Sequence, residues 1–422
     1  MFPSPLIADS QLEVNGPRET LARRFSEIRA HSLVLTAPLS AEDQCIQSMP
    51  DASPAKWHLA HSSWFFEAMV LRPHAPDYVP FDERFFYLFN SYYEALGPRH
   101  PRPLRGLLTR PSLAQVLAYR AHVDAGVQDF MNSSHETVWR RALPLLTLGL
   151  HHEQQHQELI LTDILHALSC NPMLPAYQCA PASPHKPALR MAPVTAPLHW
   201  LTGPTGTVMI GHDGSGFAFD NETPRHGALL APYRVADRLV NCGEYLQFIE
   251  DGGYQRPELW LSDGWAAVQA NGWSCPPYWL APDDARAPAG HWQVFGLSGV
   301  RALDTSAPVS QVSFYEAAAY AEWAGARLPT EFEWEAAHDA SGITQMTGYV
   351  WQWTRSSYDP YPGFRPLAGA AGEYNGKFMV GQRVLRGGSS ATPVGHTRPS
   401  YRNFFPPGAR WQFSGIRLAR DA

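Results

Sequence analysis

Residues 148–166, LGLHHEQQHQELILTDILH, decide how the N-terminal half of the chain folds. His152 and His156 are four positions apart, and a helix would place both imidazoles on one face, about one turn from each other. Leucine and isoleucine flank the pair on both sides, which indicates a buried face. Buried imidazoles need partners, and a single metal ion could serve both rings. The spacing therefore predicts a metal site on a helix.

The string HEQQH at 152–156 also matches the HExxH pattern of zinc peptidases. In that interpretation Glu153 would be the general base beside a zinc ion. The longer metzincin pattern does not follow, because Leu159 stands where that pattern needs glycine. A zinc metallopeptidase is kept as an alternative.

A third ligand is expected from another helix. The segment WHLAHSSWFFE at 57–67 offers His58 and His61, and on pattern alone either could bind the ion. Three imidazoles without a carboxylate leave open positions on an octahedral ion, and oxygen chemistry needs such positions. Iron(II) and zinc both accept sites of this kind.

A polar and aromatic stretch follows at 88–106, LFNSYYEALGPRHPRPLRG. The side chains that crowd it are Asn90, Tyr92, Tyr93, Arg99, Arg102 and Arg105. A tyrosine near an iron–oxygen species can donate a proton or a hydrogen atom. An arginine can hold a substrate carboxylate through paired hydrogen bonds. Loop packing and surface charge are the plain alternatives for these two residue types.

Residues 17 to about 170 are expected to be helical, because apolar residues recur at spacings of three and four. The predicted helices cover 18–35, 54–71, 112–131 and 138–168, the last of them whole or broken near Pro144. Pro54 suits a first helical turn, and Ser112 suits an N-cap. The pattern predicts a four-helix bundle with long crossover loops.

The rest of the chain has a different texture. Residues 171–197 are rich in proline and alanine without periodicity, which predicts a surface linker. Residues 198–422 combine dense Gly, Pro, Trp and Tyr with short strands, which predicts an irregular α+β domain after a helical domain at 1–170. Expected strands are TGTVMIG, QVSFY, RVLRGG and SGIRLAR, and expected helices lie at 242–251 and 313–324.

Composition excludes several classes of protein. The 422 residues are 45% hydrophobic with a net charge of −6 and no basic run, so nucleic acid is not an expected partner. The N-terminal segment lacks the apolar core of a signal peptide, and no apolar stretch reaches the roughly 18 residues that span a bilayer. A cytoplasmic location without membrane contact follows as the default. The five cysteines are widely spaced without CxxC, which argues against disulfides and zinc–cysteine sites. Nothing indicates an oligomeric state.

Several strings resemble the ergothioneine-synthase family of nonheme iron sulfoxide synthases, over nearly the whole chain. In the N-terminal half they are SMPDASPAKWHLAHSSWFFE, YLFNSYYEALGPRHPRPLRGLLTRPS and LGLHHEQQHQELILTDILHA. In the C-terminal half they are FAFDNETPRH, VSFYEAAAYAEWAGARLPTEFEWEAA, VLRGGSSATP and YRNFFPPGARWQFSGIRLAR. The resemblance implies a DinB-like bundle followed by a C-type-lectin-like domain of the formylglycine-generating type, and it implies an Fe(2+) centre. The family's iron ligands fall on His61, His152 and His156.

The resemblance also implies the chemistry. The family uses oxygen to form a bond at C2 of hercynine, the trimethylated betaine of histidine. By position, Gln155 and Asn403 would hold the imidazole ring and the betaine carboxylate, and one residue of the pair Tyr92 and Tyr93 would donate a proton. A trimethylammonium group suits an aromatic surround. The residues expected to bind the substrates are therefore Gln155, Asn403, Arg99, Arg102, Phe404, Phe405 and Trp411.

Some strings depart from the family pattern. GNVWEWT reads GYVWQWT at 348–354, RGGSCATP has Ser389 for cysteine, and VTNxEY reads LVNCGEY at 239–245. These changes shift the expectation slightly toward the selenoneine synthase branch, which couples hercynine to a selenosugar. The alternative is sulfoxide synthesis with cysteine or γ-glutamylcysteine. No cysteine follows Cys275, so the activity of a true formylglycine oxidase is not expected.

Overall fold

The computed structural model describes residues 17–178 and 197–422. The chain divides into two units, Met1–Asp163 and Ile164–Ala422. The segment considered as a signal peptide, 1–16, and most of the predicted linker, 179–196, lie outside the described residues.

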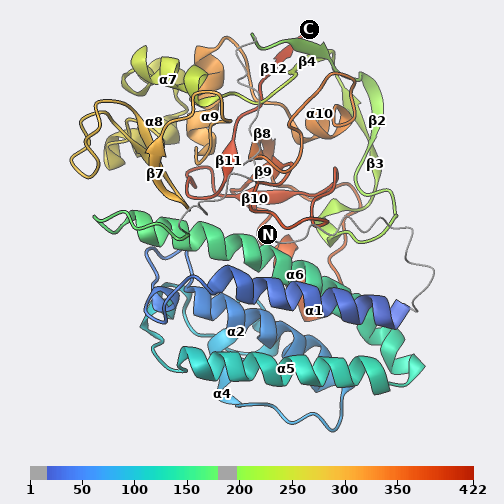
Figure 1. Ribbon diagram of the computed structural model, residues 1–422. Helices are drawn as coiled ribbons and strands as arrows, with labels where there is room; N and C mark the ends of the chain where they lie inside the picture. Colours follow the sequence, from blue (N-terminus) through green and yellow to red (C-terminus); the bar gives the residue numbers. More distant parts are fainter. Residues whose placement is uncertain (1–16, 179–196) are drawn as a thin grey trace. The chain divides into compact units, whose positions relative to one another are not determined.

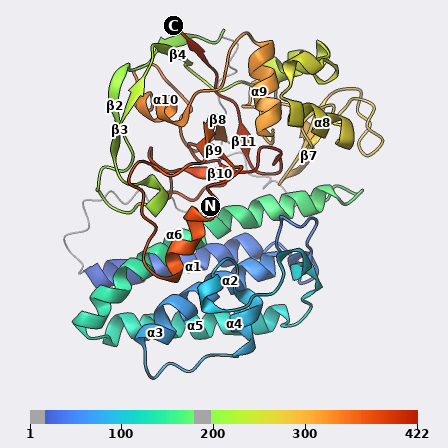
Figure 2. The ribbon, with the colours of Figure 1, turned by 180° about the vertical axis from the view of Figure 1, so that it is seen from behind.

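Long helices build the N-terminal unit, and they lie side by side as a bundle (Figure 1). They are α1 (Pro17–Thr36), α2 (Ala55–Phe66), α5 (Leu113–Ser133) and α6 (Glu136–Ser169). The shorter elements that connect them are η2 (Asp43–Cys45), η3 (Glu67–Leu71), α3 (Arg72–His74), α4 (Arg84–Phe89), η4 (Glu94–Leu96) and η5 (Arg102–Leu107). Helices α3 and α4 are seen best from behind (Figure 2). The predicted four-helix bundle with long crossover connections is confirmed.

Local signals placed the helix ends well. Ser112 caps α5, because its Oγ accepts from the Gln115 N–H at 3.3 Å while the Gln115 side chain accepts from the Ser112 N–H at 2.9 Å. Pro144 lies inside α6 without ending it. Its side chain is exposed, as is Arg140, so water can reach the carbonyl whose helical hydrogen bond the proline removes. The 138–168 region is therefore one helix.

The expected helix at 54–71 ends in a π-turn, η3. This turn carries Glu67, whose carboxylate is fully buried. It accepts hydrogen bonds from the hydroxyls of Tyr78 at 2.7 Å and Tyr119 at 2.8 Å. The π-turn therefore places Glu67 in the interior, where two tyrosine hydroxyls provide its hydrogen bonds.

The C-terminal unit is a mixture of short helices and short strands. Its helices are α7 (Cys242–Glu250), α8 (Ser262–Asn271), α9 (Phe314–Trp323), α10 (Glu331–Ala336) and α11 (Glu373–Gly376), with 3-10 turns η6 (Asp220–Glu222), η7 (Gly253–Gln255), η8 (Pro257–Leu259) and η9 (Ala370–Gly372). Its strands are β1 (Trp200–Thr202), β2 (Gly206–Ile210), β3 (His226–Leu230), β4 (Tyr233–Ala236), β5 (Trp279–Leu280), β6 (Gln293–Gly296), β7 (Gly299–Ala302), β8 (Trp351–Ser357), β9 (Arg383–Arg386), β10 (Asn403–Phe405), β11 (Ser414–Gly415) and β12 (Ala419–Asp421). The predicted α+β class is confirmed.

In the described part of the chain, the strands form small separate sheets with the orders β1-β4-β12, β10-β9-β8-β11, β2-β3 and β5-β6-β7. The sheet built on β8 and β9 is central, and only its β11–β8 pair is parallel. The indoles of Trp334, Trp351 and Trp353 are fully buried around it. Tryptophan thus supplies much of the core that such short strands cannot bury alone.

Two strand predictions were wrong in part. QVSFY at 311–315 is no strand, because Gln311 has a left-handed φ of 58° and Ser313 caps α9. SGIRLAR at 414–420 divides between β11 and β12, which belong to different sheets. Three helices of the C-terminal unit, α8, α10 and α11, were not predicted; they are short, with 10, 6 and 4 residues, so little periodicity reveals them.

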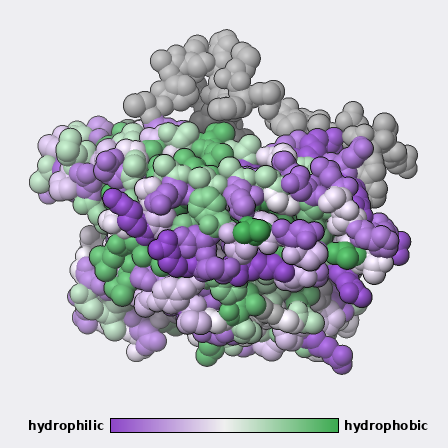
Figure 3. Space-filling view, turned by 90° about the horizontal axis from the view of Figure 1, so that it is seen from below, coloured by the Kyte–Doolittle hydropathy of each residue, from purple (hydrophilic) through white to green (hydrophobic). Residues whose placement is uncertain are grey.

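On the face shown in Figure 3, hydrophilic and hydrophobic residues are interspersed. Among the residues that the structure describes, no helix combines the length and the apolar character needed to cross a bilayer.

Candidate metal centre

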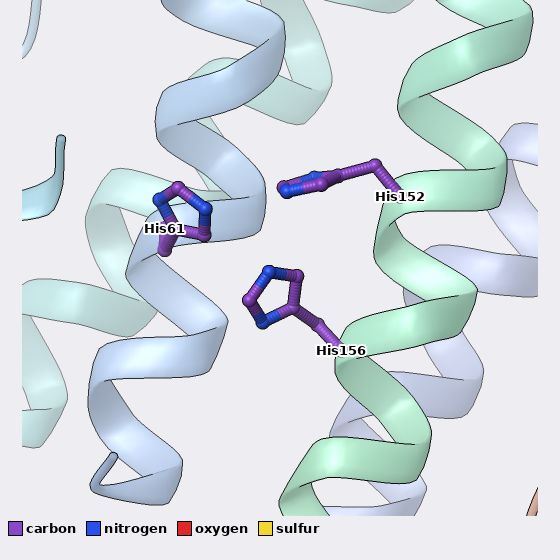
Figure 4. A group of neighbouring side chains, drawn as sticks. All are labelled: His61, His152 and His156. Atoms are coloured by element: carbon purple, nitrogen blue, oxygen red, sulfur yellow. The ribbon is translucent and has the colours of Figure 1, made fainter. Parts of the chain in front are cut away.

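Three histidines converge inside the helical bundle. His61 comes from α2, while His152 and His156 come from α6, and their rings point toward one another (Figure 4). Their ligand-offering nitrogens all lie within 4.8 Å of one another. The sequence spacing therefore brought the α6 pair to one face, and the second helix brings His61 rather than His58 to complete the group.

Aromatic rings hold the histidines in place. His61 is stacked between Trp57 and Trp64, with ring centroids 4.5 and 5.6 Å away. Phe65 is stacked on His152 at 4.6 Å. Every residue of α2 is buried, so these rings are fixed on all sides and the imidazoles have little freedom to turn away.

Hydrogen bonds leave one nitrogen of His61 free to bind a metal. Its Nδ1–H donates to the Phe89 carbonyl at 2.6 Å, so the lone pair of the neutral ring is on Nε2. His58 has no such freedom, because Nδ1 contacts His156 Nδ1 at 2.7 Å and Nε2 contacts Asp163 at 3.0 Å. The sequence pattern left the choice between His58 and His61 open. The structure favours His61, because Nε2 of His61 is available to bind a metal while both nitrogens of His58 have hydrogen-bond partners.

The donor set fits a metal ion. His152 Nδ1 is buried without a hydrogen-bond partner, a costly state for a polar atom. Burial lowers the pKa of His152 to about 4, and burial lowers the pKa of His61 and His156 well below the usual value. All three rings are therefore neutral near pH 7 and carry the lone pairs that a divalent ion requires.

Glu153, the acid of the HExxH string, belongs to a different cluster. Its carboxylate accepts from Arg29 at 3.0 Å, from Ser32 at 2.6 Å and from Arg120. Burial alone would raise the pKa of Glu153, but the charges of Arg120 and Arg29 outweigh it and hold the pKa at about 2. A carboxylate fixed and stabilised in this way is a poor general base. The zinc-peptidase interpretation therefore loses its catalytic acid–base group.

The structure separates the two tyrosines. Tyr93 is buried, with its ring stacked on Trp64 at 5.6 Å and edge-on to Phe65 at 6.2 Å. Those two rings in turn pack on ligand histidines. Tyr92 is half-buried, and its hydroxyl accepts from Arg102 at 2.9 Å. Tyr93 is thus one ring away from the centre, while Tyr92 faces the arginines.

The arginines of the same stretch also differ. Arg99 pairs with Glu94 at 2.9 Å, and Arg102 bonds to the Asp51 carbonyl, so both are engaged within the surface loops. Arg105, which the sequence grouped with them, is buried instead. Its guanidinium stacks 3.4 Å over the Trp57 ring, and burial lowers its pKa to about 9. Of the three cations it lies nearest to the histidines, because Trp57 is the ring that stacks on His61.

The remaining predicted substrate residues lie on two elements. Gln155 is half-buried on α6, three positions after His152 and therefore on nearly the same face. Asn403, Phe404 and Phe405 form β10 in the C-terminal unit, and Trp411 lies edge-on to Phe405 at 6.1 Å.

Two of these C-terminal side chains already have partners within their own unit. The Phe404 ring is stacked on Tyr358 at 4.2 Å, and the Asn403 Oδ1 accepts from the Phe404 N–H at 2.9 Å. The substrate contacts of all four C-terminal residues stay predictions.

One departure from the family strings, Gln352, lies in the packed interior. Gln352 is fully buried; its Oε1 accepts from Trp334 and Arg417, both at 2.7 Å, and its Nε2 donates to the Met346 carbonyl at 2.7 Å. A glutamate could not make that donation. This change therefore rearranges a core network.

Other departures have structural reasons as well. Ser389 is buried in a turn, where its Oγ accepts from the Ala391 N–H at 3.2 Å. Gly243 lies against Thr305, whose Cβ would be 3.2 Å from an added Cβ. Both residues fit the packing of their own unit. Their departure from the family strings therefore does not support a selenium donor.

Comparisons with known proteins agree with this two-part architecture. The sequence matches the DinB superfamily over residues 24–160 and the sulfatase-modifying factor enzyme 1-like domain over 190–342 and 337–422. The hercynine oxygenase of Mycolicibacterium smegmatis is 33% identical, with 96% of this chain and 99% of the relative covered. The hercynine oxygenase of Mycobacterium tuberculosis is 31% identical, with the same coverage of 96% and 99%. The formylglycine-generating enzyme of Thermomonospora curvata is 32% identical over 35% of this chain and 50% of its own length.

Fold and site together define a two-part protein in which a DinB-type bundle carries a three-histidine centre and a sulfatase-modifying-factor-type domain follows. The chain belongs to the hercynine oxygenase family. The resemblance seen in the sequence strings is thereby confirmed at the level of the family, and the two hercynine oxygenases among these relatives favour the sulfur alternative over the selenium branch.

Proposed function

We propose that this protein is an iron(II)- and oxygen-dependent enzyme that joins the sulfur of a thiol to C2 of the hercynine imidazole. The observation that carries the proposal is the convergence of three neutral imidazoles, two of them buried and that of His156 half-buried, in a chain of this family. In the overall reaction hercynine, the thiol and O2 give a coupled sulfoxide and one water. The C2–H and S–H bonds break, a C–S and an S–O bond form, and O2 accepts the four electrons.

His61, His152 and His156 would hold the iron. Bound ferrous iron would supply redox chemistry and open coordination positions, since three histidines do not fill an octahedral ion. The Nδ1–H bond from His61 to the Phe89 carbonyl fixes which nitrogen of that ring faces the ion. The stacked indoles of Trp57 and Trp64 keep bulk water away from the ligand.

The same chain offers residues for the substrates. Gln155 is proposed to hydrogen-bond the hercynine ring, because it lies one turn after His152. Tyr93 is proposed as the proton donor in preference to Tyr92, because its ring packs on Trp64 and Phe65. Asn403 is proposed to bind the betaine carboxylate, with Trp411 and Phe405 around the trimethylammonium group.

A thiol donor is favoured over a selenosugar. The preference for selenium rested on the changed strings, and Gln352, Ser389 and Gly243 serve the packing of the C-terminal unit. Both full-length relatives described above are hercynine oxygenases. Cysteine and γ-glutamylcysteine are the thiols to test first.

The decisive experiment incubates the protein, Fe(II), O2 and hercynine with cysteine, γ-glutamylcysteine or a selenosugar, and identifies products by mass spectrometry. We expect a product with the mass of hercynine plus the thiol, plus one oxygen and minus two hydrogens. Coupling with the selenosugar alone would overturn the choice of donor. Hercynine left unconsumed with every donor would overturn the function itself.

One control separates the zinc-peptidase alternative. Metal analysis after anaerobic loading, followed by a protease assay with Fe(II) or Zn(II), is expected to show no proteolysis with either ion, because Glu153 is locked between two arginines.

A further inference from the structure

A chain of hydrogen bonds runs outward from one of the three candidate ligands. His156 Nδ1 contacts His58 Nδ1 at 2.7 Å, and His58 Nε2 contacts an oxygen of Asp163 at 3.0 Å. The Ser53 N–H donates to the same Asp163 oxygen at 2.8 Å. His58 and Asp163 are both buried, at 2% and 6% exposure, so solvent does not compete for these bonds.

The order of the partners fixes where the protons lie. A carboxylate can only accept, so the His58 Nε2–H donates to Asp163. The Nδ1 of a neutral His58 ring is then an acceptor, and the bond to His156 requires that His156 Nδ1 carries the hydrogen. The lone pair of His156 is therefore on Nε2, the nitrogen on the other side of the ring.

The two helices support each other's ligands through this chain. Helix α2 presents His61 to the centre and, one turn earlier, presents His58 to the back of His156. Helix α6 presents His156 and, two turns later, Asp163 to the back of His58. His61 is oriented by a backbone carbonyl and His152 has an unpartnered Nδ1, so His156 is the ligand that side chains orient.

We propose that His58 and Asp163 are positioning residues that fix the tautomer and ring orientation of His156 for metal binding. The inference rests on the proposed iron site. A carboxylate linked to a ligand ring through hydrogen bonds also makes that ring a stronger donor, and loss of such an outer partner typically costs about 10–100-fold in metal affinity. No contact between His58 or Asp163 and the substrates is needed for this role.

The test compares two replacements of His58 in the full-length protein. His58→Phe keeps the ring and removes both hydrogen bonds. His58→Gln keeps an acceptor for His156 and a donor for Asp163 in one amide. We expect His58→Phe to weaken anaerobic Fe(II) binding by about 10–100-fold, measured by competition with a chelator. His58→Gln should restore most of that affinity.

Co(II) spectra supply a readout that a purely structural role would not move. Visible bands of bound Co(II) report ligand geometry, so they should change in His58→Phe and resemble the wild type in His58→Gln. His122→Phe is the matched control: His122 is a half-buried histidine of α5 whose ring bonds to the Val79 carbonyl at 2.8 Å. It should leave affinity and spectrum unchanged.

Asp163→Asn covers the case in which His58→Phe does not fold. Asparagine keeps a carbonyl oxygen for Ser53 and His58, loses the charge, and places an NH2 group where Thr162 contacts the second oxygen at 3.4 Å. The fold should persist while Fe(II) affinity falls several-fold. Unchanged affinity and spectrum in both His58→Phe and Asp163→Asn, beside a wild type that binds Co(II), would overturn the positioning role and leave the proposed function standing. Normal metal binding without turnover of hercynine would instead overturn the function and leave the positioning role intact.

Discussion

Helix α6 contributes adjacent residues to two polar clusters of different kinds. One is a group of three neutral histidines, and the other is a network of ion pairs. His152 opens the histidine centre, where the pKa values are lowered and one nitrogen has no partner. Glu153 opens an ion-pair cluster in which Arg29, Arg120 and Ser32 satisfy the carboxylate. Successive residues of a helix point about 100° apart, so residues 152–156 contribute side chains to both clusters.

The two clusters show how a binding site can be distinguished from a structural network. In the ion-pair cluster each oxygen of the Glu153 carboxylate accepts at least one hydrogen bond. In the histidine centre, ring nitrogens of three neutral imidazoles lie within 4.8 Å of one another, and Nδ1 of His152 has no hydrogen-bond partner. Unused bonding capacity in a buried place is costly unless a ligand completes it. The motif HExxH does not reveal this distinction, because it counts letters without regard to what each side chain contacts.

The largest expected effect is the loss of metal binding on replacing His152. We predict that His152→Leu weakens Fe(II) affinity by more than about 100-fold, because a ligand lost outright should cost more than an outer partner. The metal-free variant should be at least as stable as the wild type, because leucine removes a buried nitrogen that has no partner. Chelator competition and urea unfolding of the metal-free protein check both halves. A large loss of stability with normal metal affinity would make this histidine structural.

The ion-pair cluster should respond in the opposite way. We predict that Glu153→Gln lowers the free energy of unfolding by about 3–5 kcal/mol, because two buried guanidiniums lose their carboxylate. Fe(II) affinity of the folded fraction should stay near that of the wild type. Glu136→Gln is the control: its ion pairs with Arg18 and Arg140 lie at the surface, so its effect on stability should be far smaller than that of Glu153→Gln. A stable Glu153→Gln protein would contradict the structural role of this acid.

A buried histidine of the C-terminal unit is expected to make stability depend on pH. Burial, with the nearby charge of Arg398, lowers the pKa of His396 to about 3. The folded pKa is below the unfolded value of about 6.5, so this group's contribution to stability is complete above pH 6.5 and is lost as the pH falls toward 3. Between pH 7.5 and pH 5 the wild type should lose about 2 kcal/mol from this ring alone.

Urea unfolding at those two pH values tests the effect. His396→Gln cannot take up the proton, so its stability should fall by about 2 kcal/mol less than that of the wild type over the same interval. His291→Gln, at an exposed histidine, should show the wild-type dependence. Equal pH dependence in all three proteins would mean that His396 is not buried in the folded state.

The helical half could be predicted closely because its signals are local. Apolar spacing gave the bundle, Ser112 gave the start of α5, and the four-residue spacing of His152 and His156 gave a shared face. The positions of QVSFY and SGIRLAR depended on a left-handed residue and on a change between sheets, which are set by distant partners.

The surroundings of the site were missed for a related reason. Asp163 reaches His58 across 105 positions of sequence, and Arg105 is distinguished from Arg99 and Arg102 only by its stacking on Trp57. No spacing rule encodes such contacts. The sequence held one signal. His58 precedes His61 by a single helical turn, so both lie on the same face of α2, toward the histidines of α6.

The smallest expected effect concerns a polar cluster that lies at the surface. The capping box of Ser112 and Gln115 is solvent-accessible and satisfies two backbone donors of α5. We predict that Ser112→Ala lowers the free energy of unfolding by about 1 kcal/mol, because water can replace the lost partner only in part. Ser133→Ala is the matched control: its hydroxyl donates to the Asp129 carbonyl within the last turn of the same helix, so its removal should change little.

Fe(II) affinity should be unchanged in both serine variants, since neither side chain contacts the histidines. The variants at His152, Glu153 and Ser112 thus remove, in turn, a metal ligand, a buried ion pair and an exposed helix cap, and the expected effect becomes smaller along this series. If Ser112→Ala cost as much stability as Glu153→Gln, burial would not be what makes the ion-pair cluster strong, and the contrast between the two faces of α6 would need another cause.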